Sequence, residues 1–286
     1  MGHKMSRRQI LQFRSSLIED EKSRATIEKY LRDLEVFFRF VGEEDITKGL
    51  AIHYKEYLVQ KYAPSSVNSM LAAVNRFFKE MQWFECIVKP LKVQRQTFRD
   101  KERELSKDEY FRLLNAAKMR NDMRLYYLMQ TICSTGIRVS ELKFITVQAI
   151  QSGRALVSMK GKTRMVLIPS ALCRVLKRYI KERGIQKGSI FITRSGSPMD
   201  RSNILHNMKA LCEMAGVDRK KIFPHNLRHL FACLFYKAEK DLSRLADLLG
   251  HSNINTTRIY TSVSGQEQAR QIEQLGLGER EKRKTA

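Results

Sequence analysis

The chain has 286 residues, of which 43% are hydrophobic, which allows two domains of ordinary size and argues against wholesale disorder. It carries 53 Lys and Arg against 30 Asp and Glu, a formal net charge of +23, which is unusual for an enzyme of neutral substrates and implies a polyanionic partner. Residues 1–100 hold 18 basic and 13 acidic side chains and the remainder holds 35 and 17, so the second part supplies most of the positive charge.

Nucleic acid is the polyanion that fits this charge best, because Lys and Arg that neutralise phosphates release condensed counterions. Scattered surface charge is the plain alternative, and an anionic membrane is a weaker one, since no segment has the pattern of a basic amphipathic anchor. No apolar run approaches the roughly 18 residues that span a bilayer. We therefore expect a soluble, cytoplasmic protein without a membrane partner.

The cysteine pattern argues against both disulfides and zinc. The five cysteines are widely spaced, odd in number and form no CxxC pair, which is typical of buried thiols in a reducing compartment. We expect no metal and no other cofactor.

The first part of the chain predicts a small helical bundle. Apolar residues recur at spacings of three and four over 10–18, 27–41, 47–62 and 67–81, with Gly42 closing the second segment. Ser23 and Ser66 are predicted helix N-caps. We assign residues 1–87 to this domain and 88–104, where periodicity lapses and basic residues dominate, to an interdomain linker. Whether this linker is a solvated connector or a strap along a phosphate backbone is left open.

Residues 105–286 predict a second domain that is mainly α with a small β-sheet. A capping box, Ser106 with Glu109, opens its first helix, and an apolar segment ending at Gly136 should lie in its core. Alternating segments around Gly161-Lys162 predict a hairpin, and 189–193 has the pattern of a third strand. Further helices are predicted at about 138–142, 170–183, 201–215, 226–238, 242–249 and 264–276, the last opened by a capping box of Ser264 and Glu267 and followed by a basic tail.

Unusual polar residues interrupt these apolar patterns. Arg138 follows a helix-ending glycine, where a guanidinium can point into a cleft with its fork free for phosphate oxygens. His225 and Arg228 are three apart and share a helix face, and Lys160 stands at the hairpin tip. Each has an ordinary explanation when taken alone: Arg138 can pair with Glu141 on the surface, and His225 can cap a helix.

Taken together, the order and spacing of these residues resemble the tyrosine recombinases, and in size the Xer-type enzymes. The match consists of R-x-x-E-L at Arg138, a hairpin lysine at Lys160, H-x-x-R-H at 225–229, L-G-H at His251 and Tyr260 nine residues later. It covers nearly the whole chain and implies an N-terminal SAM-like helical bundle that binds the core DNA site, followed by an α+β catalytic domain. One departure is RHLFACLF after Arg228, which we interpret as variation on the buried side of a helix.

The resemblance implies a role for each matched residue. Tyr260 would be the nucleophile that forms a 3′-phosphotyrosyl link, and we expect its ring to be unburied because it must reach a phosphate. Arg138 and Arg228 would bind the nonbridging oxygens, Lys160 would protonate the leaving 5′ oxygen, His225 would act as base and His251 would hydrogen-bond the phosphate. Glu141 would orient Arg138, and His229 would have a supporting role at most. Bond energy is retained, so neither ATP nor metal is required.

The function implied is site-specific recombination of double-stranded DNA, for integration, excision or resolution. The resemblance further implies a homotetramer on two crossover sites, assembled through exchange of the C-terminal helix, with accessory proteins left open. Two alternatives remain at this point: a type IB topoisomerase that relaxes supercoils, and a DNA-binding protein that has lost catalysis. The DNA site and the biological role, whether for chromosomes or for mobile elements, cannot be read from the sequence.

Overall fold

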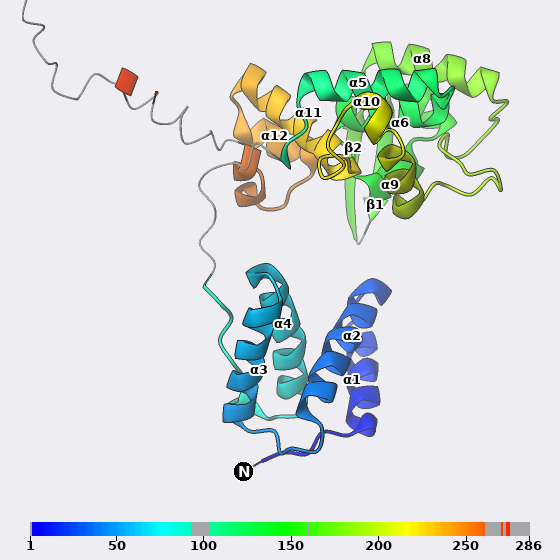
Figure 1. The fold of residues 1–286 in the computed structure, drawn as a ribbon. Helices are drawn as coiled ribbons and strands as arrows, with labels where there is room; N and C mark the ends of the chain where they lie inside the picture. Colours follow the sequence, from blue (N-terminus) through cyan, green and yellow to red (C-terminus); the bar gives the residue numbers. More distant parts are fainter. Residues whose placement is uncertain (1, 93–102, 160, 261–269, 271–272, 275–286) are drawn as a thin grey trace, which may run out of the picture. The chain divides into compact units, whose positions relative to one another are not determined.

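The computed structural model describes residues 2–92, 103–159, 161–260, 270 and 273–274 (Figure 1). The chain divides into two compact units, Met1–Arg95 and Gln96–Ala286. In the described residues, helices dominate and one two-stranded sheet is present, which confirms the predicted mainly α fold. The exact extent of the predicted linker stays a prediction, because most of it lies outside the described residues.

Within residues 2–92, four α-helices form the N-terminal unit, as the apolar periodicity predicts: α1 (Arg7–Glu19), α2 (Arg24–Val41), α3 (Lys48–Lys61) and α4 (Pro64–Glu80). Aromatic rings fill the space between them, and Phe37 lies at the centre, with ring contacts of 4.8 Å to Tyr54 and 5.6 Å to Phe78. All three rings are fully buried. The unit therefore has a core of its own.

The caps of these helices show which local signals are reliable. The Ser23 hydroxyl accepts from Thr26 N at 3.3 Å, as predicted, and Gly42 ends α2 with a φ of +58°. The predicted cap at Ser66 is wrong: α4 begins at Pro64, with Ala63 as its N-cap. Proline is suited to the first helical position because the N–H that it lacks would have had no intrahelical partner there.

Two asparagines fasten the chain that leaves α4 after the short 3₁₀ helix η1 (Phe84–Cys86). Asn75 binds both backbone groups of Val88, at 3.0 and 2.8 Å, and Asn68 binds both of Leu91, at 2.7 and 3.0 Å. These bonds attach the first residues of the predicted linker to the N-terminal unit.

The second unit is built around α6 (Met123–Thr135), which is buried on most sides as predicted, with Leu128, Met129 and Ile132 fully inaccessible. It packs against α5 (Lys107–Met119), α8 (Ser170–Glu182) and α11 (Pro224–Glu239). The capping box of Ser106 and Glu109 is confirmed at the start of α5. The remaining elements are η3 (Val139–Phe144), α7 (Val147–Ser152), α9 (Arg201–Lys209), α10 (Cys212–Ala215), α12 (Leu242–Leu249), η4 (Ile254–Thr256) and η5 (Arg258–Tyr260).

The hairpin pairs β1 (Arg154–Met159) with β2 (Lys162–Leu167) in antiparallel register. Lys162 is already in β2, opposite Met159, so the predicted turn at Gly161-Lys162 lies one residue too far along the chain. Gly161 has a φ of +70°, which a glycine adopts without strain. One face of the hairpin packs on the core through Val157 and Val166, and Arg164, which pairs with Val157, lies on this same face.

Two other expectations for this unit need correction, and one helix was not predicted. The predicted third strand at 189–193 forms only isolated bridges, Thr146 with Ser189 and Ile192 with Pro198, although Ile190 and Phe191 are buried. Its apolar run reflects burial and not sheet pairing. The helix predicted for 201–215 is broken between α9 and α10, and α7 was not predicted.

No helix in the described part of the chain is long and apolar enough to cross a membrane.

Candidate active site

The C-terminal end of α12 gathers three arginines that come from three different elements. The last carbonyls of a helix lack intrahelical partners and carry the negative end of its dipole, so they attract cations. Three consecutive carbonyls each accept from one guanidinium here. The pairs are Arg164 Nη1 with Leu248 O at 2.9 Å, Arg228 Nη2 with Leu249 O at 2.8 Å and Arg138 Nη2 with Gly250 O at 3.0 Å.

Glu141 joins two of these arginines. Its Oε1 accepts from Arg138 Nη1 at 2.9 Å and its Oε2 from Arg164 Nη2 at 2.7 Å, while only 5% of its side chain is exposed. Burial alone would raise the pKa of this carboxyl, but the hydrogen bonds and charges of Arg164 and Arg138 outweigh it and hold the pKa below its ordinary value. Glu141 is therefore a carboxylate at neutral pH that contacts the Arg138 guanidinium, and its role in orienting Arg138 stays a prediction.

Arg138 lies at the start of η3, two residues after Gly136 ends α6, and 37% of its side chain is exposed. The expectation of a free fork is wrong for this state, because Nη1 binds Glu141 and Nη2 binds Gly250. Its other N–H donors have no partner among the described residues. The guanidinium is thus held from one side and open on another.

Arg228 is almost completely buried, with 1% of its surface exposed. It donates to the carbonyl of Gly136 at the end of α6 and to that of Leu249 at the end of α12. Burial, followed by the nearby charge of Arg138, lowers its pKa to about 10, so the side chain remains cationic at neutral pH. Two helix termini therefore stabilise one buried positive charge.

His251 follows the Gly250 cap, and both of its ring nitrogens have partners. Arg228 Nη2 lies 3.0 Å from Nε2, and the Thr257 hydroxyl lies 2.9 Å from Nδ1. A guanidinium can only donate, so Nε2 accepts and the ring proton sits on Nδ1. Burial and the charges of Arg228 and Arg138 lower the pKa of His251 to about 4. The ring is neutral at physiological pH.

Tyr260 is buried, with 2% of its surface exposed, so the expectation of an unburied ring is wrong for this state. It packs in a small apolar cluster with Ala232, Leu245 and Leu249, which covers the ring despite the polar sequence around it. Burial raises the pKa of the phenol, while the charge of Arg228 and its hydrogen bond to the phenol act in the opposite direction. The hydroxyl therefore lies beside the buried arginine.

The two histidines of α11 lie in different settings. His225 has an exposed side chain in the first turn of α11. The protein atoms around its ring remove part of its hydration, and this loss lowers its pKa together with the charges of Arg228, Arg201 and Arg138. His229 stacks edge-on against Tyr260 at 5.1 Å between ring centroids, and its Nδ1 lies 3.4 Å from Cys233 Sγ. A carboxylate oxygen of Glu104 lies 3.8 Å from its Nε2. His229 thus supports the ring of Tyr260.

The structure brings most of the predicted set together, with one exception and one addition. Lys160 lies outside the described residues, so its role stays a prediction. Arg164 was not predicted from the sequence. The signal was present, because alternation along β2 places Arg164 on the same face as Val166 and Ile168, and an arginine on an apolar face requires a partner.

A pocket opens over this cluster. Its lining shows that Arg138, Glu141, Arg164 and His251 all contribute surface to one cavity beside the inner face of the hairpin. The full lining is Arg138, Ser140, Glu141, Val157, Met159, Thr163, Arg164, Gly250, His251 and Ser252. Such a pocket, with the partly exposed guanidinium of Arg138 and several hydroxyls at its wall, suits a tetrahedral anion.

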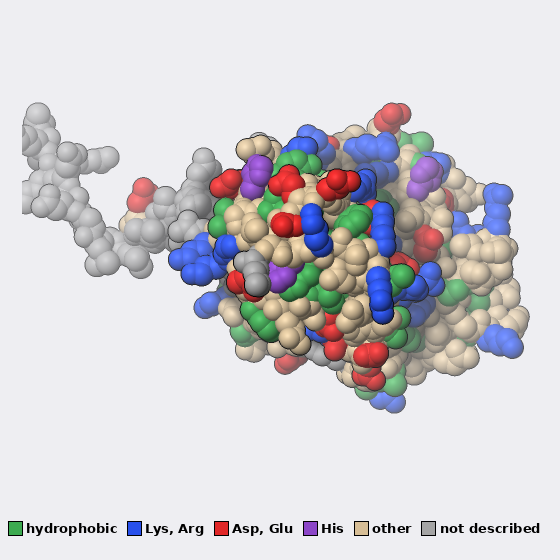
Figure 2. Space-filling model, turned by 90° about the horizontal axis from the view of Figure 1, so that it is seen from below, with side chains coloured by type: hydrophobic (Ala, Val, Ile, Leu, Met, Phe, Trp, Pro, Cys, Tyr) green, Lys and Arg blue, Asp and Glu red, His purple; other side chains and the backbone are tan. Residues whose placement is uncertain are grey.

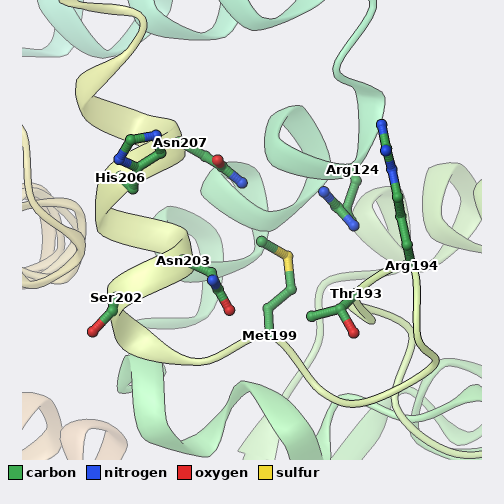
Figure 3. Close-up of a pocket in the computed structure, with 8 residues that line it drawn as sticks. All are labelled: Arg124, Thr193, Arg194, Met199, Ser202, Asn203, His206 and Asn207. Atoms are coloured by element: carbon green, nitrogen blue, oxygen red, sulfur yellow. The ribbon is translucent and has the colours of Figure 1, made fainter.

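A second pocket in the same unit lies on α9 (Figure 3). Four polar side chains of α9 line one side, and Arg124 and Arg194 line the other, with Met199 between them. The α9 side chains are Ser202, Asn203, His206 and Asn207. None of the predicted catalytic residues lines this pocket. Figure 2 shows basic and acidic side chains interspersed among the described residues in view.

Within the described residues, one group of side chains has the spacing of metal ligands: His3, Glu85 and Cys86. It lies in the N-terminal unit, where His3 already binds Glu85 and stacks on Trp83 with ring centroids 4.6 Å apart. It is not part of the cluster around Tyr260.

Comparison with known proteins places this fold and site. Residues 103–267, more than half of the chain, match the phage integrase family, and residues 10–83 match the N-terminal SAM-like domain of phage integrases. The chain therefore belongs to the phage integrase family. The predicted relationship to the tyrosine recombinases is confirmed.

Individual relatives agree with this assignment. The chain is 29% identical to the tyrosine recombinase XerA of Thermococcus kodakarensis over 94% of this chain and 98% of that protein, and 27% identical to a tyrosine recombinase of Agathobacter rectalis over 86% and 87%. Among solved structures, XerA recombinase matches with a TM-score of 0.52 at 26% identity, covering 96% and 99% of the two chains. A lambda integrase dimer bound to a core site matches with a TM-score of 0.74 at 17% identity over 90% and 95%, which supports the fold. The comparisons favour a site-specific DNA recombinase over a type IB topoisomerase or a silent DNA-binding protein.

Proposed function

We propose that this protein cleaves and rejoins double-stranded DNA through a covalent bond between Tyr260 and a 3′ phosphate. The observation that carries the proposal is the convergence of two guanidinium groups and a neutral imidazole beside the phenol of Tyr260. Cleavage of a phosphodiester needs a nucleophile, positive donors for the nonbridging oxygens and a proton for the leaving oxygen. In this proposal Tyr260 supplies the nucleophile, and Arg138 and Arg228 supply the positive donors.

The reaction is a transfer without net oxidation or hydrolysis. The phenol oxygen forms a bond to phosphorus, the bond from phosphorus to the 5′ oxygen breaks, and Lys160 gives that oxygen a proton. His225 takes the proton of the phenol, and its lowered pKa supports this role because the ring is then neutral and able to accept. The reverse step uses the same groups with a 5′ hydroxyl as nucleophile, which rejoins the strand.

The arginines have distinct parts in this proposal. Arg138 presents its open N–H donors to one nonbridging oxygen, and Arg228 supplies a fixed charge deeper in the site. His251 donates from Nε2 to the phosphate once its proton has moved from Nδ1 to Nε2 and Arg228 Nη2 has turned from Nε2 to the phosphate. The Thr257 hydroxyl can then donate to Nδ1. Because the phenol is buried in this state, DNA cleavage also requires that its hydroxyl become accessible.

The partners follow from the same proposal. The substrate is a double-stranded crossover site, and two such sites are joined by a homotetramer, in line with the lambda integrase tetramer bound to a Holliday junction that shares this fold. Exchange of the C-terminal helix stays a prediction, because 264–276 falls almost entirely outside the described residues. A cytoplasmic location and a need for accessory proteins stay predictions as well.

Covalent trapping tests the proposal on DNA of many sequences at once. The full chain is incubated with a pool of nicked duplexes of randomised sequence, so that the short 5′-hydroxyl fragment released by cleavage diffuses away and the adduct accumulates. We expect a denaturation-resistant adduct with the wild type and none with Tyr260→Phe. Tyr236→Phe is the matched control, because Tyr236 packs beside the same apolar cluster. Adduct formation by Tyr260→Phe would show that another nucleophile is used.

The captured sequences then supply the substrate for later measurements. Two copies of the selected site on one plasmid distinguish recombination from relaxation. A recombinase exchanges the two sites and gives no product on a plasmid with a single site. A type IB topoisomerase relaxes supercoils whether the plasmid has one site or two, and yields no exchange.

A further inference from the structure

Arg164 makes the same pair of contacts as Arg138, from the opposite side of Glu141. Each guanidinium gives one nitrogen to the Glu141 carboxylate and the other to a carbonyl at the end of α12. Arg164 comes from β2, however, and only 15% of its side chain is exposed against 37% for Arg138. Arg138 is therefore placed to meet a substrate, and Arg164 is placed to hold the carboxylate.

Gly250 shows that the position of Arg164 is tightly fitted. A Cβ on Gly250 would lie 2.3 Å from Cδ of Arg164 and 2.8 Å from its Nε, closer than real carbon atoms come. The glycine also has a φ of +63°, at the cap between α12 and His251. The side chain of Arg164 thus occupies the space that any other residue at 250 would fill.

The consequence for the site follows from the burial of Glu141. A buried carboxylate with one guanidinium on each oxygen has one stable orientation. Without Arg164, Oε2 keeps only the neutral backbone N–H of Arg138, so the carboxylate is held less firmly and part of its charge is uncompensated. Any rotation of Glu141 moves Arg138, since Arg138 Nη1 and backbone N both bind it at 2.9 Å. Arg164 also joins β2, the strand that follows the hairpin tip, to Leu248 near the start of the His251 loop.

We propose that Arg164 is a positioning residue for DNA cleavage, which fixes the Glu141 carboxylate and through it the guanidinium of Arg138, and which ties the β1–β2 hairpin to the end of α12. The inference rests on the proposed function, because it assumes that Arg138 contacts the reacting phosphate. Arg164 itself does not need to touch DNA.

Single-turnover cleavage of the selected nicked duplex at saturating protein measures the effect. We expect Arg164→Met to lower the cleavage rate by about 10- to 100-fold, since a misplacement of about 1 Å has effects of this size. DNA affinity should change by less than about twofold, because the residue is not a phosphate contact. Arg164→Lys should recover part of the rate, because its ammonium restores a positive charge beside Glu141 but lacks the fork with which Arg164 binds both Glu141 and Leu248. Arg154→Met, an exposed arginine on the same hairpin, is the matched control.

Two further readouts separate positioning from mere stabilisation. In a Glu141→Gln background, Arg164→Met should cost much less than in the wild type, because the two side chains act through one contact. A duplex with a methyl group in place of one nonbridging oxygen carries no negative charge at the scissile phosphate, so on it the defect of Arg164→Met should shrink. A defect caused by loss of folding would persist on both substrates.

If Arg164→Met does not fold, Gly250→Ala tests the same idea with every charge retained. The added methyl must displace Arg164, whereas Gly216→Ala, with a φ of +57° and nothing within 4 Å, carries the backbone strain alone. We expect slower cleavage for Gly250→Ala only. Two outcomes overturn the inference. One is undiminished cleavage by both Arg164→Met and Gly250→Ala, and the other is a cleavage defect of Arg164→Met that is as large in the Glu141→Gln background as in the wild type. In either case, adduct formation by the wild type leaves the proposed function intact. Absence of any wild-type adduct overturns the proposed function, and this inference with it.

Discussion

The pKa of His251 reflects the positive charges that surround its ring. Its pKa is about 4 because burial and three arginines disfavour a second proton, while its ordinary value is 6.5. Glu141, the carboxylate that faces the same arginines, has a lowered pKa and stays ionised at more acidic pH than an ordinary glutamate. Between pH 6.5 and about 4, His251 is therefore protonated in the unfolded chain and neutral in the folded chain.

The sign of the resulting pH dependence is fixed by this difference. More protons on the unfolded state mean that the free energy of unfolding falls as the pH is lowered from 6.5 towards 4. His225, whose pKa is also lowered, contributes in the same direction. We expect His251→Gln to flatten this part of the profile, measured by chemical denaturation at a series of pH values. An unchanged slope would mean that His251 is readily protonated in the fold.

Single residues were predicted from the sequence to different degrees. The motif positions identified Arg138, Arg228 and His251, and the structure brings them together around α12. Arg164 was missed because the resemblance supplied no motif for it, although strand alternation placed it on the inner face. The burial of Tyr260 was also missed, since the polar residues around it gave no sign of the apolar cluster formed by α11 and α12.

At the scale of elements, the end of α6 is the most constrained point of the site. Gly136 has a φ of +62°, its carbonyl binds Arg228, and a Cβ there would lie 2.5 Å from the ring of Phe231 and 3.0 Å from Leu249. Gly136→Ala should therefore lower the free energy of unfolding by about 2 kcal/mol or more, from backbone strain and overpacking together.

Gly216→Ala measures the strain alone, because Gly216 has a similar φ and open space around it. Thermal unfolding of both variants separates the two contributions. Equal losses in the two variants would mean that Phe231 moves aside at little cost.

α9 offers a second prediction at this scale. Its polar side chains and Arg194 line the pocket of Figure 3, and amide groups of asparagine can read base edges, whereas arginine neutralises phosphates. We expect Arg194→Gln to weaken binding on all DNA sequences and to reduce the salt slope of binding by about 1. Asn203→Ala should instead alter the sequences captured in covalent trapping. Arg174→Gln, exposed on α8, is the control and should change neither.

Element prediction succeeded where period and length agreed and failed where burial alone produced the pattern. α1, α2, α4 and α12 carry clear 3.6-residue periods, and their existence was predicted. The segment 189–193 is apolar because Ile190 and Phe191 are buried, yet it finds no partner strand beyond isolated bridges among the described residues. A short apolar run cannot distinguish these cases.

At the scale of the molecule, the division into two units has a thermodynamic consequence. The buried residues of the N-terminal unit and those of the second unit form separate apolar clusters that share no residue within the described chain. Each unit is large enough to bury a core, and cooperative unfolding follows the core. We therefore expect the full chain to unfold in two transitions by calorimetry.

Matched substitutions assign these transitions. Phe37 and Leu128 are both fully buried, one in each cluster, and their truncation to alanine should cost about 3–5 kcal/mol and about 2–5 kcal/mol respectively. Phe37→Ala should lower the midpoint of one transition and leave the other unchanged, and Leu128→Ala should do the reverse. The catalytic cluster lies wholly in the second unit. When the protein is first bound to DNA and then heated, only Leu128→Ala should therefore lower the temperature at which adduct formation stops. A common shift of a single transition by both variants would show that the two cores unfold as one cooperative body.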